Sequence, residues 1–393
     1  MFRETERIFG QKVLRPLPSI AQDGEGWDDM AEWVSRDHSK GEIDRAGTTL
    51  RNWWGNLEIR RMQDMTEDER NKIGNAWGIC SNWRSSHAMP LLSFRMGLTH
   101  RARKVQSESL IAQRVKRMPS ILNKLVREPA MQLSQMQDLG GCRAIMADVE
   151  SVYRVFDLYR GSSEQGLFDE EIANSLKCYD YIRNPKADGY RGIHVVGRYR
   201  PRFEKHDQWS GNRIEIQLRT QLQHTLATTV ETVTTFTRKP LKFGGGPEMW
   251  RRFFALSGSA FALVEGTPLI PGTPQKSHEI VQELRALSKE LRVKQRLKAW
   301  TRALKTLPRR NLKGAKWLLL ILDVERNTIK VTGFSDRMKA AAANAAIEQS
   351  PRAKHLDAVL AWVPSAKTLR AAYPNYYADT RVFLASLESV LER

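Results

Sequence analysis

The sequence has few cysteines and no long apolar run, and each shortage excludes a class of protein. Its three cysteines, Cys80, Cys142 and Cys178, form no CxxC pair, which argues against a disulfide scaffold and favours reduced thiols. The longest aliphatic run, residues 317–322, is far shorter than the roughly 20 residues that a membrane-spanning helix needs. The first ten residues carry charges where a signal peptide needs an apolar run. We therefore expect a cytoplasmic protein that does not act at a membrane.

Acidic residues are scarce relative to basic ones. The chain has 63 Lys and Arg against 44 Asp and Glu, a net charge of +19. Residues 285–316 hold 12 basic residues and one acidic residue, so this segment alone has a net charge of +11. Such an excess indicates an anionic partner such as nucleic acid, a nucleotide or an acidic membrane surface. The alternative interpretation is a solvated helix face.

The 393 residues suggest two or three domains. Residues 1–105 are rich in Trp and show helical spacing, and residues 106–240 mix strand and helix patterns. Residues 241–276 are expected to form a linker and a helix between Gly-rich and Pro-rich breaks. Residues 277–393 are expected to form a basic helix followed by a small α/β module. The expected class is therefore α+β.

Several helices are predicted from local signals. Thr66 and Glu69 form a capping box before a helix with Ile73, Ala76, Trp77 and Cys80 on one side, and Pro90 is expected to break the next helical pattern. Ser277 is expected to cap one long basic helix that continues to about residue 306. Further predicted helices cover residues 150–159, 222–236 and 336–349 and follow residues 365 and 379.

Strands are predicted at residues 142–149 and 213–219 and in the C-terminal module at 317–324, 328–333 and 357–363. Residues 179–182 and 193–196 are predicted to form two further strands joined by a charged, aromatic connection. In the segment RIEIQLR, Ile214, Ile216 and Leu218 face one way and Glu215, Gln217 and Arg219 face the other.

Polar residues of these strands could hold a metal or a phosphate. Glu215 lies on the polar face of its strand, His194 points away from the apolar face of another, and Asp138 precedes a third, beside Gly140 and Gly141. Each alone would more often be structural. If Asp138 and Glu215 meet at one sheet edge, two carboxylates plus phosphate oxygens would suit Mg²⁺.

A cluster of basic residues could supply a phosphate clamp. The segment QRVKRMPSILNKL contains Arg114, Lys116, Arg117 and Lys124, with Ser120 expected to cap a helix. The sequence contains no GxxxxGK[ST] motif, so the clamp is not a P-loop.

Four motifs occur in an order that resembles the synthetase domain of RelA/SpoT-type alarmone synthetases. They are RxKxxxSIxxK, DLGGCR, DYIxxPKxxGYxxxH and EIQLRT, and the resemblance covers about residues 106–232. It implies a nucleotidyltransferase-like mixed sheet flanked by helices. It also implies transfer of a pyrophosphoryl group from ATP to a ribose 3′-hydroxyl, usually of GDP or GTP.

The resemblance implies roles for individual residues. Asp138 and Glu215 would hold Mg²⁺, with Glu215 also acting as general base. The residues assigned to ATP are Arg114, Lys116, Ser120, Lys124 and Arg143. Those assigned to the acceptor nucleotide are Lys186, Tyr190, His194, Gln217 and Arg219, with Tyr190 stacking on the base.

The sequence also departs from the family pattern. Its only His-Asp dipeptide, His206-Asp207, lies downstream of the motifs, so no alarmone hydrolase is expected. Tyr179 stands where the family usually has Lys, Asp188 where it usually has Asn, and Gly192 where it usually has Ser. These changes affect the side of the site that would hold the acceptor phosphates.

Three functions therefore remain open. The motifs favour synthesis of (p)ppGpp from GDP or GTP. The basic segment 285–316, the run Arg101-Arg103-Lys104 and the altered acceptor residues favour a relative that modifies the 3′ end of tRNA, as some toxins do. The third is an inactive nucleotide- or RNA-binding regulator. The C-terminal module could recognise RNA, a ligand or a neutralising protein, or it could serve packing or homo-oligomerisation.

Overall fold

The protein is described here from a computed structural model. The structure describes residues 33–55, 65–160, 176–237, 248–303, 317–323, 328–350, 356–362 and 380–392, together with residues 315, 326 and 352.

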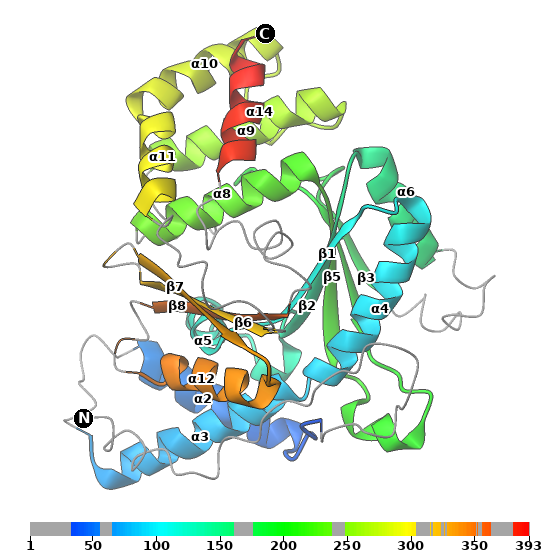
Figure 1. Cartoon of the computed structure of the whole chain (residues 1–393), viewed down its shortest axis with the longest axis vertical. Helices are drawn as coiled ribbons and strands as arrows, with labels where there is room; N and C mark the ends of the chain where they lie inside the picture. The colour runs from blue at the N-terminus through cyan, green and yellow to red at the C-terminus, as the bar shows by residue number, and fades with distance from the viewer. Residues whose placement is uncertain are drawn as a thin grey trace.

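A five-stranded mixed sheet forms the centre of the described chain (Figure 1). Its strands are β1 (Leu110–Val115), β2 (Gly140–Met146), β3 (Lys177–Asp180), β4 (Ile193–Arg198) and β5 (Arg213–Thr220). Their order is β1-β2-β5-β4-β3, and only β2 and β5 pair in parallel. The predicted mixed sheet flanked by helices is confirmed.

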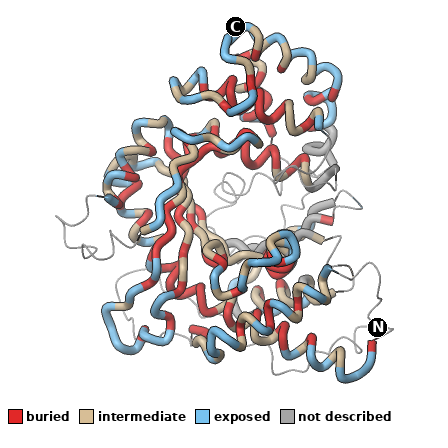
Figure 2. Tube along the Cα trace, turned by 180° about the vertical axis from the view of Figure 1, so that it is seen from behind, coloured by how far each residue is buried: buried red, intermediate tan, exposed pale blue. Residues whose placement is uncertain are grey.

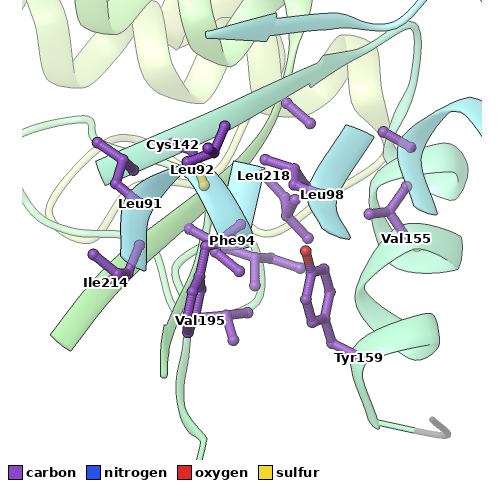
Figure 3. Packing of buried hydrophobic residues seen from close by; sticks show 14 of the residues in the cluster. Leu91, Leu92, Phe94, Leu98, Cys142, Val155, Tyr159, Val195, Ile214 and Leu218 are labelled. Atoms are coloured by element: carbon purple, nitrogen blue, oxygen red, sulfur yellow. The ribbon is translucent and has the colours of Figure 1, made fainter. Parts of the chain in front are cut away.

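One face of this sheet is apolar and is covered by helices. The inward side chains of β5, Ile214, Ile216 and Leu218, are fully or almost fully buried, as the alternation predicts. They pack with Leu98 of α4 (Ala88–Val105) and Val155 of α6 (Val149–Arg160) (Figure 3). The opposite face is therefore left for polar residues.

A second core joins the N-terminal helices to α5 (Met118–Arg127). Helices α2 (Lys40–Gly55) and α3 (Glu67–Ser85) pack around Ile43, Leu50, Trp77, Ile121 and Leu125. Thr66 and Glu69 form the predicted capping box at the start of α3. Two short 3₁₀ helices, η3 (Leu133–Gln135) and η5 (Glu204–Trp209), lie in connections.

A third core is helical and lies beyond the sheet. It is formed by α8 (Gln221–Thr237), α9 (Glu248–Glu265), α10 (Ser277–Glu290), α11 (Val293–Ala303) and α14 (Arg381–Leu391), which group at the top of Figure 1. Figure 2 shows buried residues running along both the sheet and these helices.

The C-terminal module contains a three-stranded antiparallel sheet. Its strands are β6 (Trp317–Asp323), β7 (Thr328–Phe334) and β8 (Leu356–Trp362), in the order β7-β6-β8, and α12 (Arg337–Glu348) packs on them. These elements match the predicted strands and Ala-rich helix. The helix expected after residue 365 lies outside the described residues. No helix in the described ranges is long and apolar enough to cross a bilayer.

Several sequence predictions were wrong in detail. The long basic helix is two helices, because Arg292 adopts a left-handed conformation with φ 49°. This turn lets both Leu291 and Val293 enter the core. Lys276, not Ser277, is the residue before α10, and it makes no side-chain cap.

Two other boundaries also differ from the predictions. Pro90 lies in the first turn of α4, where a missing N–H costs no helical hydrogen bond. The strand predicted at 142–149 begins at Gly140 and ends at Met146, with Val149 already in α6.

Candidate active site

The strand register brings the two candidate carboxylates to one place. Because β2 and β5 are parallel neighbours, Gly141 lies beside Glu215, and Asp138 is three residues before Gly141. On the other side of Gly141 lies Arg114 of β1. A cavity of about 500 Å³ opens on this polar face. Arg114, Asp138 and Glu215 all line it.

Two lysines hold the Asp138 carboxylate. Lys116 Nζ lies 2.7 Å from Asp138 Oδ2, and Lys124 Nζ lies 3.1 Å from Asp138 Oδ1. Burial acts to raise the pKa of Asp138, but attraction to these lysines and their hydrogen bonds outweigh it and hold the pKa well below its usual range. Asp138 is therefore ionised, and both lysines lie where a phosphate could replace it as their partner.

Glu215 is fixed by hydrogen bonds from both sides. His194 Nδ1 lies 2.9 Å from Glu215 Oε1, and Gln217 Nε2 donates to Glu215 Oε2 at 2.6 Å. Arg219 in turn donates to Gln217 Oε1 at 2.7 Å. Burial acts to raise the pKa of Glu215, yet the hydrogen bond and charge of His194 lower it overall. Glu215 is therefore a carboxylate that can accept a proton.

An aromatic cluster forms the opposite wall. The Tyr190 hydroxyl contacts His194 Nε2, and the guanidinium of Arg219 lies 5.1 Å from the centre of the Tyr190 ring. Lys186 Nζ lies 4.1 Å from the centre of the Tyr181 ring, which stacks on Tyr179 at 6.0 Å and also meets Tyr190 and His194 edge to face. Burial raises the pKa of Tyr190 to about 12. This wall offers ring faces and cations together.

The connection between β3 and β4 is a structured loop. Asp180 Oδ1 accepts from the backbone N–H groups of Ile182 and Arg183, so the predicted strand ends at Asp180 rather than at residue 182. Asp188 Oδ1 accepts from the backbone N–H of Tyr190 at 3.0 Å. Gly189 has φ 89°, a conformation that favours glycine. The Asp at position 188 thus has a backbone partner within its own loop.

The cavity gathers every residue assigned to the metal, ATP or the acceptor except Ser120, and Arg117 of the basic cluster does not line it either. Ser120 was expected to cap a helix, but α5 begins at Met118 and Arg117 precedes it without a side-chain cap. Pro119 occupies the second position of the helix, which places Ser120 within its first turn rather than before it.

Other cavity residues were not singled out from the sequence. They include Tyr181, Arg191, Gln223, Ala227 and Glu231. The last three lie on one side of α8 at spacings of four residues, a helical pattern that the sequence does contain. Arg191 has no comparable signal, because its partner is distant in sequence.

The donor chemistry of the site fits a hard divalent cation. The described residues contain no cluster of three or more His, Cys, Asp and Glu side chains that could hold a metal. Two carboxylates, Asp138 and Glu215, nevertheless face one cavity with basic residues around it. Mg²⁺ is usually bound by one or two carboxylates together with substrate phosphates, so the pair is sufficient.

Comparison with known proteins locates the similarity in this part of the chain. Residues 113–238 match the family model described as "Region found in RelA / SpoT proteins". The chain is 30% identical over 88 residues to the GTP pyrophosphokinase YwaC of Bacillus subtilis, covering 21% of this chain and 38% of that protein. It is 31% identical over 147 residues to the uncharacterized protein Rv1366 of Mycobacterium tuberculosis, covering 36% of this chain and 45% of that protein. The chain thus spans less than half of these relatives.

Solved structures show a weaker overall likeness. Small alarmone synthetase 1 of Bacillus subtilis, solved with its product pppGpp, matches with a TM-score of 0.37 and 21% identity over 46% of this chain and 90% of that one. Small alarmone synthetase 2 of the same organism matches with a TM-score of 0.38 and 18% identity, over 47% of this chain and 93% of that one. The segment that holds the candidate site, residues 113–238, is therefore the part of the chain that matches the RelA/SpoT region.

Proposed function

We propose that the protein transfers a pyrophosphoryl group from ATP to the 3′-hydroxyl of GDP or GTP and so makes (p)ppGpp. The observation that carries this proposal is the juxtaposition of Asp138, held by two lysines, with Glu215, held by His194, in one cavity of a RelA/SpoT region. One side of the cavity is basic and suits a triphosphate. The other is aromatic and suits a base.

The basic side would bind ATP. Arg114, Lys116, Lys124 and Arg143 line it, and basic groups at fixed positions neutralise the charge of a transferring phosphoryl group. Asp138 and Glu215 would hold Mg²⁺, which supplies further charge neutralisation when bound. As phosphate oxygens approach, Lys116 and Lys124 would release Asp138 and pair with the phosphates of the substrate instead.

The aromatic side would bind the acceptor. Tyr190 would stack on the base, and Lys186 would contact the acceptor phosphates. Glu215 would accept the proton of the 3′-hydroxyl, because each carboxylate oxygen keeps lone pairs beyond those used by His194 and Gln217. The 3′-oxygen then bonds to the β-phosphorus of ATP as the bond to the α–β bridging oxygen breaks, and AMP leaves.

A second candidate acceptor is the 3′ end of tRNA. Six basic residues of α10, α11 and their junction are exposed: Arg285, Lys289, Arg292, Lys294, Arg296 and Lys298. Helix α10 packs on α9, which packs on α8 at the edge of the cavity. A polyanion on this surface would bind with strong dependence on salt concentration. The remainder of segment 285–316, beyond residue 303, lies almost entirely outside the described residues.

The test offers the acceptors in parallel. The protein is incubated with Mg²⁺ and ATP labelled at the γ-phosphate, and with GDP, GTP or bulk tRNA. Label in a guanosine nucleotide supports the proposal, label on tRNA supports the second candidate, and label in none supports an inactive binding protein. Arg292→Glu/Arg296→Glu should weaken transfer to tRNA and leave transfer to GDP unchanged.

A further inference from the structure

Helix α9 lies outside the matched RelA/SpoT region and yet contacts the loop that forms the acceptor wall. The match ends at residue 238, whereas α9 spans Glu248–Glu265. The loop between β3 and β4, residues 181–192, carries Lys186 and Tyr190. Two independent contacts join the two elements, one between backbones and one between charges.

The backbone contact is between two glycines. A Cβ placed on Gly258, in the middle of α9, would lie 3.0 Å from the carbonyl oxygen of Gly189 and 3.1 Å from its Cα. A Cβ placed on Gly189 would lie 2.5 Å from the carbonyl oxygen of Phe254, one turn earlier in α9. The loop therefore lies directly on the helix, with room for no side chain between them.

The charged contact is a buried ion pair. Arg191 Nη2 lies 2.7 Å from Glu265 Oε2, and the two side chains are 1% and 8% exposed. Arg191 also donates to the hydroxyl of Thr267. Glu265 accepts from Thr220 at the end of β5 and, at 3.1 Å, from Gln223 of α8. The last residue of α9 thus connects the loop to the strand that carries Glu215.

Helix α9 is held in place by the helical core. Trp250, Phe253 and Phe254 are almost fully buried, and Phe253 and Phe254 contact Phe383 of α14. A change in the packing of these helices would therefore reach the loop through α9. The contacts on the loop flank Tyr190 on both sides, at Gly189 and Arg191.

We propose that α9 is part of the acceptor site: Gly258 and Glu265 fix the loop that carries Lys186 and Tyr190. Arg191 is then a positioning residue, committed to Glu265 rather than to substrate phosphate. The inference rests on the proposed function for its effect on acceptor binding. The physical link between α9 and the loop does not depend on which acceptor is used.

The test compares two carboxylates that both pair with arginines and involve α9. Glu265→Gln removes the partner of Arg191, whereas the control Glu283→Gln removes the partner of Arg252, which lies on α9 but faces α10. Glu265→Gln weakens the contact that holds the loop, so Lys186 and Tyr190 are less precisely placed for the acceptor. KM for the acceptor should therefore rise about tenfold or more. KM for ATP should change little, and Glu283→Gln should change neither constant.

Gly258→Ala provides a second variant that does not depend on a buried charge. Alanine favours helix over glycine, so the change alone should not weaken α9. Its methyl group would lie 2.9 Å from Ile270 Cγ1 and 3.0 Å from the carbonyl oxygen of Gly189, so Ile270 and the loop must both shift and KM for the acceptor should rise again. The proposal would be overturned if these variants raised KM for the acceptor and KM for ATP equally. It would also be overturned if both Glu265→Gln and Gly258→Ala kept the wild-type KM for the acceptor.

Hydrogen exchange separates this inference from the proposed function. The amides of Tyr181, Lys186 and Gly189 form hydrogen bonds within the loop. Both variants should speed their exchange about tenfold or more without substrate, while Glu283→Gln should not. If the wild type transfers to no acceptor, the proposed function fails but this measurement still applies. Unchanged exchange in folded Gly258→Ala protein would refute the link itself.

Discussion

His194 lies between Glu215 and Tyr190, and each of its two ring nitrogens contacts one of these residues. Its Nδ1 is 2.9 Å from Glu215 Oε1, and its Nε2 contacts the Tyr190 hydroxyl. A carboxylate proposed as general base is thereby connected, through one ring, to the tyrosine proposed to stack on the acceptor. The first two predictions follow from this chain of contacts.

Replacing Glu215 should remove catalysis and leave the fold. Glu215→Gln keeps the shape of the side chain but cannot take the proton of the 3′-hydroxyl, so kcat should fall about 10²–10⁴-fold. Steady-state kinetics and thermal unfolding measure the two effects. Glu150→Gln, an exposed change in the first turn of α6, is the control. Turnover like that of wild type would show that Glu215 is not the base.

Two replacements of Tyr190 should separate its ring from its hydroxyl. Tyr190→Phe keeps the stacking face and loses the contact with His194, so kcat should fall more than KM rises. Tyr190→Ala removes the ring, which contributes about 1–3 kcal/mol when a base stacks on it, so KM for the acceptor should rise at least several-fold. Identical effects of the two variants would contradict this division.

Asp138 should make folding stability depend on pH. Its pKa is lower in the folded protein than the value of about 3.9 in an unfolded chain. Its contribution is therefore complete above pH 3.9 and is lost as the pH falls through the folded pKa. Asp138→Asn should lower the free energy of unfolding by about 1–3 kcal/mol at pH 7, because it leaves Lys116 and Lys124 without a charged partner.

Urea unfolding at pH 7, 5 and 3 would measure this difference. The gap between wild type and Asp138→Asn should persist from pH 7 to 5 and narrow at pH 3. A gap that stays constant down to pH 3 would mean that the lysines do not lower the pKa of Asp138.

The capping box of α3 gives a prediction remote from the site. Thr66→Ala should lower the free energy of unfolding by about 1 kcal/mol, because the N–H of Glu69 loses its acceptor. Thr48→Ala, an exposed position inside α2, is the matched control and should have a smaller effect. Chemical denaturation of both variants provides the measurement, and equal losses would contradict the capping role.

The polar face of the sheet was predictable because strand alternation is local. Once Ile214, Ile216 and Leu218 are assigned to the core, Glu215, Gln217 and Arg219 must point the other way. Four ordered motifs then supplied the residues around them. The same local reasoning failed at Ser120, because α5 begins at Met118 without a side-chain cap and Ser120 already lies within its first turn.

The break between α10 and α11 could not be predicted from helical spacing. The leucines of residues 284–304 fit one continuous stripe. At the turn at Arg292, both flanking residues, Leu291 and Val293, enter a core shared with α9 and α14. Segments that are distant in the chain form this core, so the local spacing of leucines could not predict the turn.

By itself the sequence determined the described strands other than β1, most of the helices, the RelA/SpoT motifs and the residue types of the site. These depend on alternation, capping and motif order, which act over a few residues. The tertiary structure alone decided the parallel pairing of β2 with β5, which brings Asp138 to Glu215. It also decided the contact of α9 with the acceptor loop, since Arg191 and Glu265 are joined by folding and not by spacing.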